Sequence, residues 1–307
     1  MTRTDAKNEE WFEETLYSAH WRQRLKVTRT LARGETAWQK IWLFENPSWG
    51  KVLVLDDALQ LTTGDEFSYH EMLAHPPILA HGRARHVAIV GGGDGGTLRE
   101  VCRHAGVARV TMMELDPDVI AFSKKHLPEV SGGAFDDPRL DLVIGDAARS
   151  VAADGPGFDV IIVDSTDCFG PGEVLFGEAF YAACRRRLNP GGILVTQLGN
   201  PAIDGFVMEK ALANQARAGF ADVRIYLTVV PTYIGGHLAV GWASDDPAVY
   251  DVPLDALRER PVPEGLRYYS PEIHAAARVL PPWLGELVAR SLAGARAGSD
   301  AASASAD

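Results

Sequence analysis

The chain has 307 residues, of which 46% are hydrophobic, and it carries a formal net charge of −11 at pH 7. This length and composition suffice for one large folded domain, alone or with a smaller appendage. The negative charge disfavours nucleic acid and anionic membranes as partners and is compatible with a cationic ligand.

Neither export nor membrane insertion is predicted. The first residues, MTRTDAKNEEWFEE, lack the apolar core of a signal peptide, and no apolar run approaches the length that spans a bilayer. The three cysteines, Cys102, Cys168 and Cys184, are scattered and form no CxxC pair. We therefore expect reduced thiols and a cytoplasmic protein.

Residues 1–64 predict a small β-domain. Short runs of β-branched or aromatic residues are separated by Gly, Asn, Pro and Asp, which is typical of strands joined by turns. The runs are LKVTRTLARG at 25–34, AWQKIWLFEN at 37–46, GKVLVLDD at 50–57 and ALQLTT at 58–63. From Asp65 onward, apolar residues at helical spacing predict a helix that opens the next domain.

Residues 65–293 alternate between strand-like and helix-like segments. The strand-like runs lie at 86–92, 109–115, 139–145, 158–164 and 191–197, and two later ones at 222–233 and 237–244 extend the series. Helical segments are expected near 96–105, 117–127, 147–153, 177–188 and 206–218. This alternation predicts an α/β fold, a Rossmann-like, doubly wound and mostly parallel sheet with helices on both faces. Residues 294–307 are small and polar and predict a disordered tail.

A glycine-rich loop follows the first of these strands. In HVAIVGGGDGGTLREV, Gly91, Gly93 and Gly96 satisfy the G-x-G-x-x-G pattern between a strand and a helix. Glu114 ends the next strand, at the right distance to bind ribose hydroxyls. The pattern predicts an adenosine site, but it does not distinguish a nicotinamide cofactor from a sulfonium one.

Asp94 lies in the middle of this loop. A dinucleotide would bring its pyrophosphate close to the loop, where a carboxylate repels it. S-adenosylmethionine carries no phosphate, and its decarboxylated form presents only a sulfonium and a propylammonium. The loop is therefore predicted to hold a cation.

Three further acids lie near predicted strand ends. Asp146 follows the third strand, where it either accepts from an adenine amine or caps the next helix. Asp164 ends the fourth strand and Asp167 follows it, with no Arg or Lys nearby. In an open parallel sheet the ligand crevice lies at the carboxyl ends of the strands, so this pair predicts a negative pocket. The alternative for Asp167 is a helix cap in a hydrophilic turn.

At these residues the chain resembles the polyamine aminopropyltransferase family. The matching motifs extend over about residues 11–280 and are DEFSYHEM, GGGDGGTLREV, ELDPDVI, DSTD with GPGEVLF, PTYIGG and YYSPEIHAAA. The resemblance implies a small N-terminal β-domain followed by a Rossmann-like domain of the type that binds S-adenosylmethionine. It also implies a homodimer or homotetramer.

The resemblance implies a role for each matching residue, in two groups. The residues that bind the nucleoside cosubstrate are Gln39, His70, Asp94 (on the aminopropyl ammonium), Glu114 (on the ribose), and Asp146 with Ala147 (on the adenine). The residues of the diamine pocket are Tyr69, Asp164, Asp167 and Tyr233, with Trp11 at its far end and Gln60 and Gln197 as further candidates. Asp164 is implied to be the general base that deprotonates the attacking amine.

The implied reaction transfers an aminopropyl group from decarboxylated S-adenosylmethionine to putrescine and needs neither a cofactor nor a metal. The products are spermidine and methylthioadenosine. Cys168 replaces the Pro that usually follows DSTD, and QLGN at 197–200 departs from the bacterial pattern, so cadaverine, agmatine or a longer polyamine stay open as acceptors. A methyltransferase that uses S-adenosylmethionine and a non-catalytic polyamine-binding regulator are the other functions left open.

Overall fold

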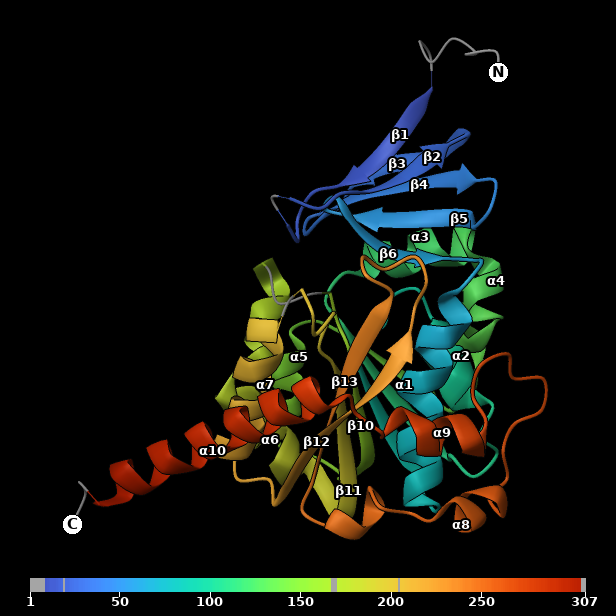
Figure 1. Cartoon of the computed structure of the whole chain (residues 1–307). Helices are drawn as coiled ribbons and strands as arrows, with labels where there is room; N and C mark the ends of the chain where they lie inside the picture. Colours follow the sequence, from blue (N-terminus) through green and yellow to red (C-terminus); the bar gives the residue numbers. More distant parts are fainter. Residues whose placement is uncertain (1–8, 19, 167–169, 204, 305–307) are drawn as a thin grey trace.

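The computed structural model describes residues 9–18, 20–166, 170–203 and 205–304 (Figure 1). In this part of the chain, two small antiparallel sheets form the N-terminal end of the molecule and one seven-stranded sheet forms the centre of the rest. The prediction of a small β-domain in front of a Rossmann-like, mostly parallel sheet is confirmed.

The N-terminal strands form hairpins. Strand β1 (Glu10–Glu14) pairs with β2 (Gln23–Val27), and the second sheet has the order β3 (Arg29–Glu35), β4 (Lys40–Asn46), β5 (Gly50–Leu55) and β6 (Ala58–Thr62). One face of this four-stranded sheet, with Leu43 and Leu53, packs against Val119 and Leu127 of the large domain. The small domain is thus joined to the large one by a shared apolar core.

Strand β1 was not predicted from the sequence. Its residues, EWFEE, are mostly acidic, and only Phe12 and Glu14 are buried. Side chains alternate between the two faces of a strand, so Trp11 and Glu13 point to the other face. A five-residue strand with so many charges carries little apolar signal.

The central sheet has the strand order β12-β13-β11-β10-β7-β8-β9. Its strands are β7 (His86–Gly91), β8 (Arg109–Glu114), β9 (Leu140–Ile144), β10 (Phe158–Asp164), β11 (Leu188–Gln197), β12 (Asp222–Val229) and β13 (His237–Ser244). From β11 to β9 the strands are parallel, and β13 and β12 add an antiparallel edge. Strands β8 and β9 lie on one side of β7, and β10 and β11 lie on its other side. The strand order therefore reverses between β7 and β10, and open sheets of this kind bind ligands at that point.

Helices cover both faces of the central sheet (Figure 1). They are α1 (Glu66–His81), α2 (Gly96–Cys102), α3 (Pro117–His126), α4 (Pro128–Ser131), α5 (Ala147–Ala152), α6 (Glu178–Arg187), α7 (Gly205–Arg217), α8 (Leu254–Arg258), α9 (Pro271–Ala277) and α10 (Pro282–Ala304). Alternate residues of β10 serve the two faces: Val160 and Ile162 pack in one core with α1 and α2, and Ile161 and Val163 pack in the other with α6 and α7. This explains why the strands are continuously apolar.

The end of the chain differs from its prediction. A disordered tail was expected from residue 294, but α10 continues to Ala304 and projects from the body in Figure 1. Alanine has the highest helix propensity, so the alanine-rich composition that makes this segment weakly hydrophobic also favours a helix. Within the described residues, no helix combines the length and apolar character needed to cross a membrane.

Candidate active site

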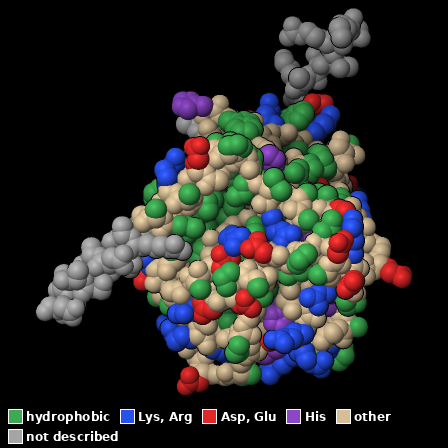
Figure 2. Space-filling view, turned by 60° about the horizontal axis from the view of Figure 1, so that its bottom comes forward, with side chains coloured by type: hydrophobic (Ala, Val, Ile, Leu, Met, Phe, Trp, Pro, Cys, Tyr) green, Lys and Arg blue, Asp and Glu red, His purple; other side chains and the backbone are tan. Residues whose placement is uncertain are grey.

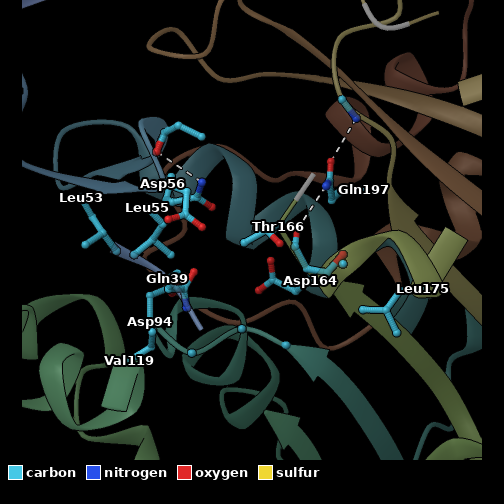
Figure 3. Close-up of a pocket in the computed structure, with 18 of the residues that line it drawn as sticks. Gln39, Leu53, Leu55, Asp56, Asp94, Val119, Asp164, Thr166, Leu175 and Gln197 are labelled. Atoms are coloured by element: carbon cyan, nitrogen blue, oxygen red, sulfur yellow. Dashed lines mark hydrogen bonds between the residues drawn. The ribbon is translucent and has the colours of Figure 1, made fainter. Parts of the chain in front are cut away.

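A cavity of about 560 Å³ lies where the small β-domain meets the carboxyl ends of the central strands (Figure 3). The described residues that line it include seven acids and neither Lys nor Arg. The acids are Glu14, Asp56, Asp94, Glu114, Asp116, Asp146 and Asp164. By contrast, the face shown in Figure 2 has acidic and basic side chains interspersed. The cavity is therefore suited to a cationic ligand.

The glycine loop forms one wall of this cavity. Gly91 ends β7 with φ +82°, and a Cβ atom there would lie 2.2 Å from the backbone oxygen of Asp164. A Cβ atom on Gly96 would lie 2.2 Å from Cε1 of His70. Only glycine permits both approaches, so the glycines bring the loop against the end of β10 and against α1.

Asp94 is held at the turn of the loop. Its Oδ1 accepts a hydrogen bond from the Gly96 N–H at 2.7 Å and lies 3.3 Å from Nε2 of His70. Burial raises the pKa of Asp94, but the attraction of His70 outweighs this, so the pKa lies below its ordinary value. The side chain is 19% exposed and lines the cavity as an anion.

Asp164 lies at the switch point of the sheet, where it pairs with Gly91 across the parallel strands. Its Oδ1 accepts a hydrogen bond from the Tyr69 hydroxyl at 2.7 Å, and its buried Oδ2 has no partner among the described residues. Burial and the nearby Asp94 raise the pKa of Asp164. A buried acceptor without a donor is costly, and Asp164 lines the cavity wall, so a ligand with an N–H group would satisfy it.

A row of contacts leads from Asp164 into the small β-domain. The rings of Tyr69 and Tyr233 meet edge to face at 6.0 Å, and the Tyr233 hydroxyl donates to the backbone oxygen of Gln60 at 2.7 Å. The neighbouring Leu59 N–H donates to Glu14 at 2.8 Å. This row places Tyr69 and Tyr233 together in the cavity with Gln60, which the resemblance gave as a further candidate, and adds the buried Glu14.

Three other residues were assigned to the diamine pocket, and among the described ones only Gln197 lines the cavity. Trp11 does not line the cavity: it lies on the outward face of β1, where the Arg24 guanidinium covers its ring at 5.1 Å. Glu14, on the opposite face of the same strand, takes the inward position. Asp167 lies outside the described residues. Gln197 lines the cavity with its amide bonded to Ser165 and Gly199 (Figure 3).

A second acidic group surrounds the end of β8. Glu114 accepts from the Asp116 N–H at 2.9 Å, and Gln39 donates to Asp116 at 3.2 Å. Burial, with smaller effects from Asp116 and Asp164, raises the pKa of Glu114 to about 7. Sequence reasoning identified Glu114 and Gln39 but missed Asp116, although it is part of the ELDPD motif and caps α3.

Asp146 is a helix cap, as one of its two interpretations predicted, and its position leaves the adenine contact as a prediction. It caps α5 by accepting from the Ala148 and Arg149 N–H groups, and together with Ala147 it also lines the cavity. All described residues assigned to the nucleoside cosubstrate therefore border one cavity: Gln39, His70, Asp94, Glu114, Asp146 and Ala147.

Both parts of the chain match known protein families. Residues 66–252 match the spermine/spermidine synthase domain, and residues 10–63 match the spermidine synthase tetramerisation domain. The polyamine aminopropyltransferase 1 of Pseudomonas aeruginosa is 50% identical over 89% of this chain and 96% of its own. The polyamine aminopropyltransferase of Escherichia coli is 43% identical over 92% of this chain and 98% of its own.

Solved structures show the same fold. A crystal structure of a spermidine synthase in complex with the transition state analogue AdoDATO matches with a TM-score of 0.86 and 36% identity, over 91% of this chain and 95% of that one. The spermidine synthase of Thermotoga maritima matches with a TM-score of 0.83 and 35% identity, over 91% and 94% of the two chains. This chain belongs to the polyamine aminopropyltransferase family and is an enzyme of that class.

Proposed function

We propose that this enzyme transfers the aminopropyl group of decarboxylated S-adenosylmethionine to putrescine and releases spermidine and methylthioadenosine. The observation that carries the proposal is a pair of carboxylates at the ends of neighbouring strands, Asp94 held by His70 and Asp164 held by Tyr69. The cosubstrate has two positive groups, a sulfonium and a propylammonium, and it matches a cavity lined by acids.

In this proposal the nucleoside occupies the side of the cavity near β8 and α5. Glu114 accepts from the ribose hydroxyls, Asp146 and the Ala147 N–H bind the adenine, and Gln39 closes the site from the small β-domain. Asp94 binds the propylammonium. S-adenosylmethionine itself has a carboxylate at that position, which Asp94 repels, so the decarboxylated form is preferred.

The acceptor lies along the row from Asp164 to Glu14. A diamine with an ammonium at each end fits a channel that has a carboxylate at each end and the rings of Tyr69 and Tyr233 between them. Asp167 is a further candidate for this pocket. The shape of a short α,ω-diamine is the reason for naming putrescine as the acceptor.

The chemistry is an in-line displacement. The attacking amine must first lose a proton, since an ammonium has no lone pair, and Asp164 takes it. The nitrogen lone pair then forms a bond to the carbon next to sulfur, the C–S bond breaks, and the sulfur leaves as a neutral thioether. Because the leaving group needs no activation, alignment supplies most of the rate and the base adds roughly 10²–10⁴-fold.

Three properties accompany this proposal. No cofactor is needed, because the sulfonium already provides the leaving group. The match of residues 10–63 to a tetramerisation domain favours a homo-oligomer, either a dimer or a tetramer. The scattered cysteines favour a reducing compartment, so we place the reaction in the cytoplasm.

A turnover assay over a panel of amines tests the proposal. The purified protein is given decarboxylated S-adenosylmethionine with putrescine, cadaverine, agmatine or spermidine, and methylthioadenosine release is measured. We expect putrescine to have the highest kcat/KM, and S-adenosylmethionine to give no aminopropylated product. A higher kcat/KM for another amine would refute the acceptor, and methyl transfer from S-adenosylmethionine would refute the reaction.

Glu114→Gln is expected to weaken methylthioadenosine binding about ten- to a hundred-fold, since hydrogen bonds to a charged acceptor contribute roughly 1.5–3 kcal/mol. The pKa of about 7 adds a pH signature. In the native enzyme the affinity rises as the pH increases through about 7 and Glu114 ionises, whereas the Gln variant shows no such rise. Calorimetry at several pH values checks both; equal pH profiles would mean that Glu114 does not hold the ribose.

A further inference from the structure

His70 lies between two carboxylates. Its Nδ1 is 2.5 Å from Oε2 of Glu66, one helical turn earlier on α1, and its Nε2 is 3.3 Å from Oδ1 of Asp94. A neutral imidazole has one N–H and cannot donate to both, so this geometry calls for the imidazolium, which has two. Burial lowers the pKa of His70, but Asp94 and Glu66 together raise it to about 10.

A cation next to Asp94 works against the binding of another cation. Both His70 and a bound ammonium interact with the same carboxylate, and both are positive. The site therefore needs a negative charge on the far side of the imidazolium, and Glu66 provides it. Glu66 is buried, and burial raises its pKa, but the contacts with His70 and Arg99 outweigh this and leave it low.

The charged neighbourhood of His70 comes from three parts of the fold. The titratable groups facing it are Glu66 and Tyr69 on α1, Asp94 on the glycine loop with Arg99 beyond Glu66 on α2, and Asp164 at the end of β10. Arg99 pairs with Glu66 at 2.9 Å and with Glu100 at 2.7 Å. His70 and the half-buried Arg99 thus each contact at least one glutamate.

We propose that Glu66 is a positioning residue that neutralises the His70 imidazolium, so that Asp94 keeps its attraction for the aminopropyl ammonium while His70 orients its carboxylate. The inference rests on the proposed role of Asp94 and goes beyond it, because Glu66 does not line the cavity. Asp94 Oδ1 is committed to His70 and Gly96, which leaves Oδ2 for the ligand.

The test compares Glu66→Gln with the native enzyme in the binding of decarboxylated S-adenosylmethionine. At about pH 6.5, the variant keeps a charged His70 without its counter-charge, and we expect its dissociation constant to be about ten-fold higher than the native value. Loss of Glu66 also lowers the pKa of His70. As the pH rises to about 8.5, His70 loses its proton and the ratio of the two dissociation constants falls towards about one to three.

Three controls separate this effect from simple damage. Methylthioadenosine has no ammonium, so its affinity is unchanged if the variant is folded. Glu100→Gln removes the other buried carboxylate that pairs with Arg99. Its histidine partner is His75 and not His70, so its effect on cosubstrate binding is smaller and does not follow the titration of His70. The double variant Glu66→Gln/His70→Gln removes both charges and binds the cosubstrate more tightly than Glu66→Gln does at about pH 6.5.

The outcomes are distinct. A ratio that stays constant with pH, or a double variant as weak as Glu66→Gln, overturns the inference about Glu66. If Asp94→Asn leaves the affinity for decarboxylated S-adenosylmethionine unchanged, the fault lies instead in the proposed role of Asp94.

Discussion

Asp164→Asn is expected to lower kcat roughly 10²–10⁴-fold while the variant still binds methylthioadenosine. The amine acceptor has a pKa near that of lysine, about 10.4, so it arrives protonated and a base must take the proton. Among the described residues, one buried oxygen of Asp164 has no hydrogen-bond partner. Burial and Asp94 raise the pKa of Asp164, which makes it a stronger base than an ordinary aspartate. Asparagine keeps the shape and the contact with Tyr69 but cannot take the proton.

Steady-state kinetics with both substrates, and separate calorimetry with methylthioadenosine, measure this loss. Asp167→Asn is the companion variant, and we expect it to raise KM for the diamine more than it lowers kcat. If Asp164→Asn retains kcat and Asp167→Asn loses it, the base is Asp167.

Asp94→Asn is expected to weaken the binding of decarboxylated S-adenosylmethionine about 30- to 1,000-fold, since removing one partner of a buried charge pair costs roughly 2–4 kcal/mol. The affinity for methylthioadenosine should stay within a few-fold. The variant also removes a negative neighbour of Asp164, whose pKa then falls. Because the base must be ionised, activity is lost as the pH falls through the pKa of Asp164, and this loss moves to lower pH in the variant.

Calorimetry with the two nucleosides and a pH profile of kcat for the residual activity check these expectations. Equal weakening of both nucleosides would place Asp94 on the nucleoside and not on the propylammonium. An unshifted pH profile would show that Asp94 and Asp164 do not interact.

The parts of the site that could be predicted are those that follow from parallel strands. Glu114 and Asp164 end apolar strands, and Asp94 lies in the turn that follows another. The carboxyl ends of parallel strands meet at one edge of the sheet, so the proximity of these acids follows from the alternation of elements alone. The G-x-G-x-x-G pattern also identifies the strand and the turn that face the ligand. Local patterns suffice here because the fold repeats one simple unit.

Glu14 could not be found in this way. The pairing of β1 with β2 is hidden by the charged sequence of β1, and the bond from Leu59 to Glu14 joins residues distant in the sequence, so neither leaves a local pattern. The resemblance pointed to Trp11, three residues away on the opposite face of the same strand. A strand exposes alternate residues to each side, so the side facing the cavity depends on how β1 packs, which the sequence does not display. The same limit applies to Glu66, because its proposed role depends on its contact with His70, which in turn contacts Asp94.

Helix α1 holds both of the reacting centres through consecutive residues, Tyr69 on Asp164 and His70 on Asp94. The distance between Asp164, the proposed base, and Asp94, the proposed ligand of the aminopropyl ammonium, is thus set by two adjacent residues of one helix. The far end of the proposed acceptor channel is built by another part of the chain, the strands that carry Glu14 and Gln60. Sequence changes in the N-terminal hairpins would therefore change the length of the amine that this channel accepts. The spacing of Asp94 and Asp164, on which the reaction depends, would stay the same.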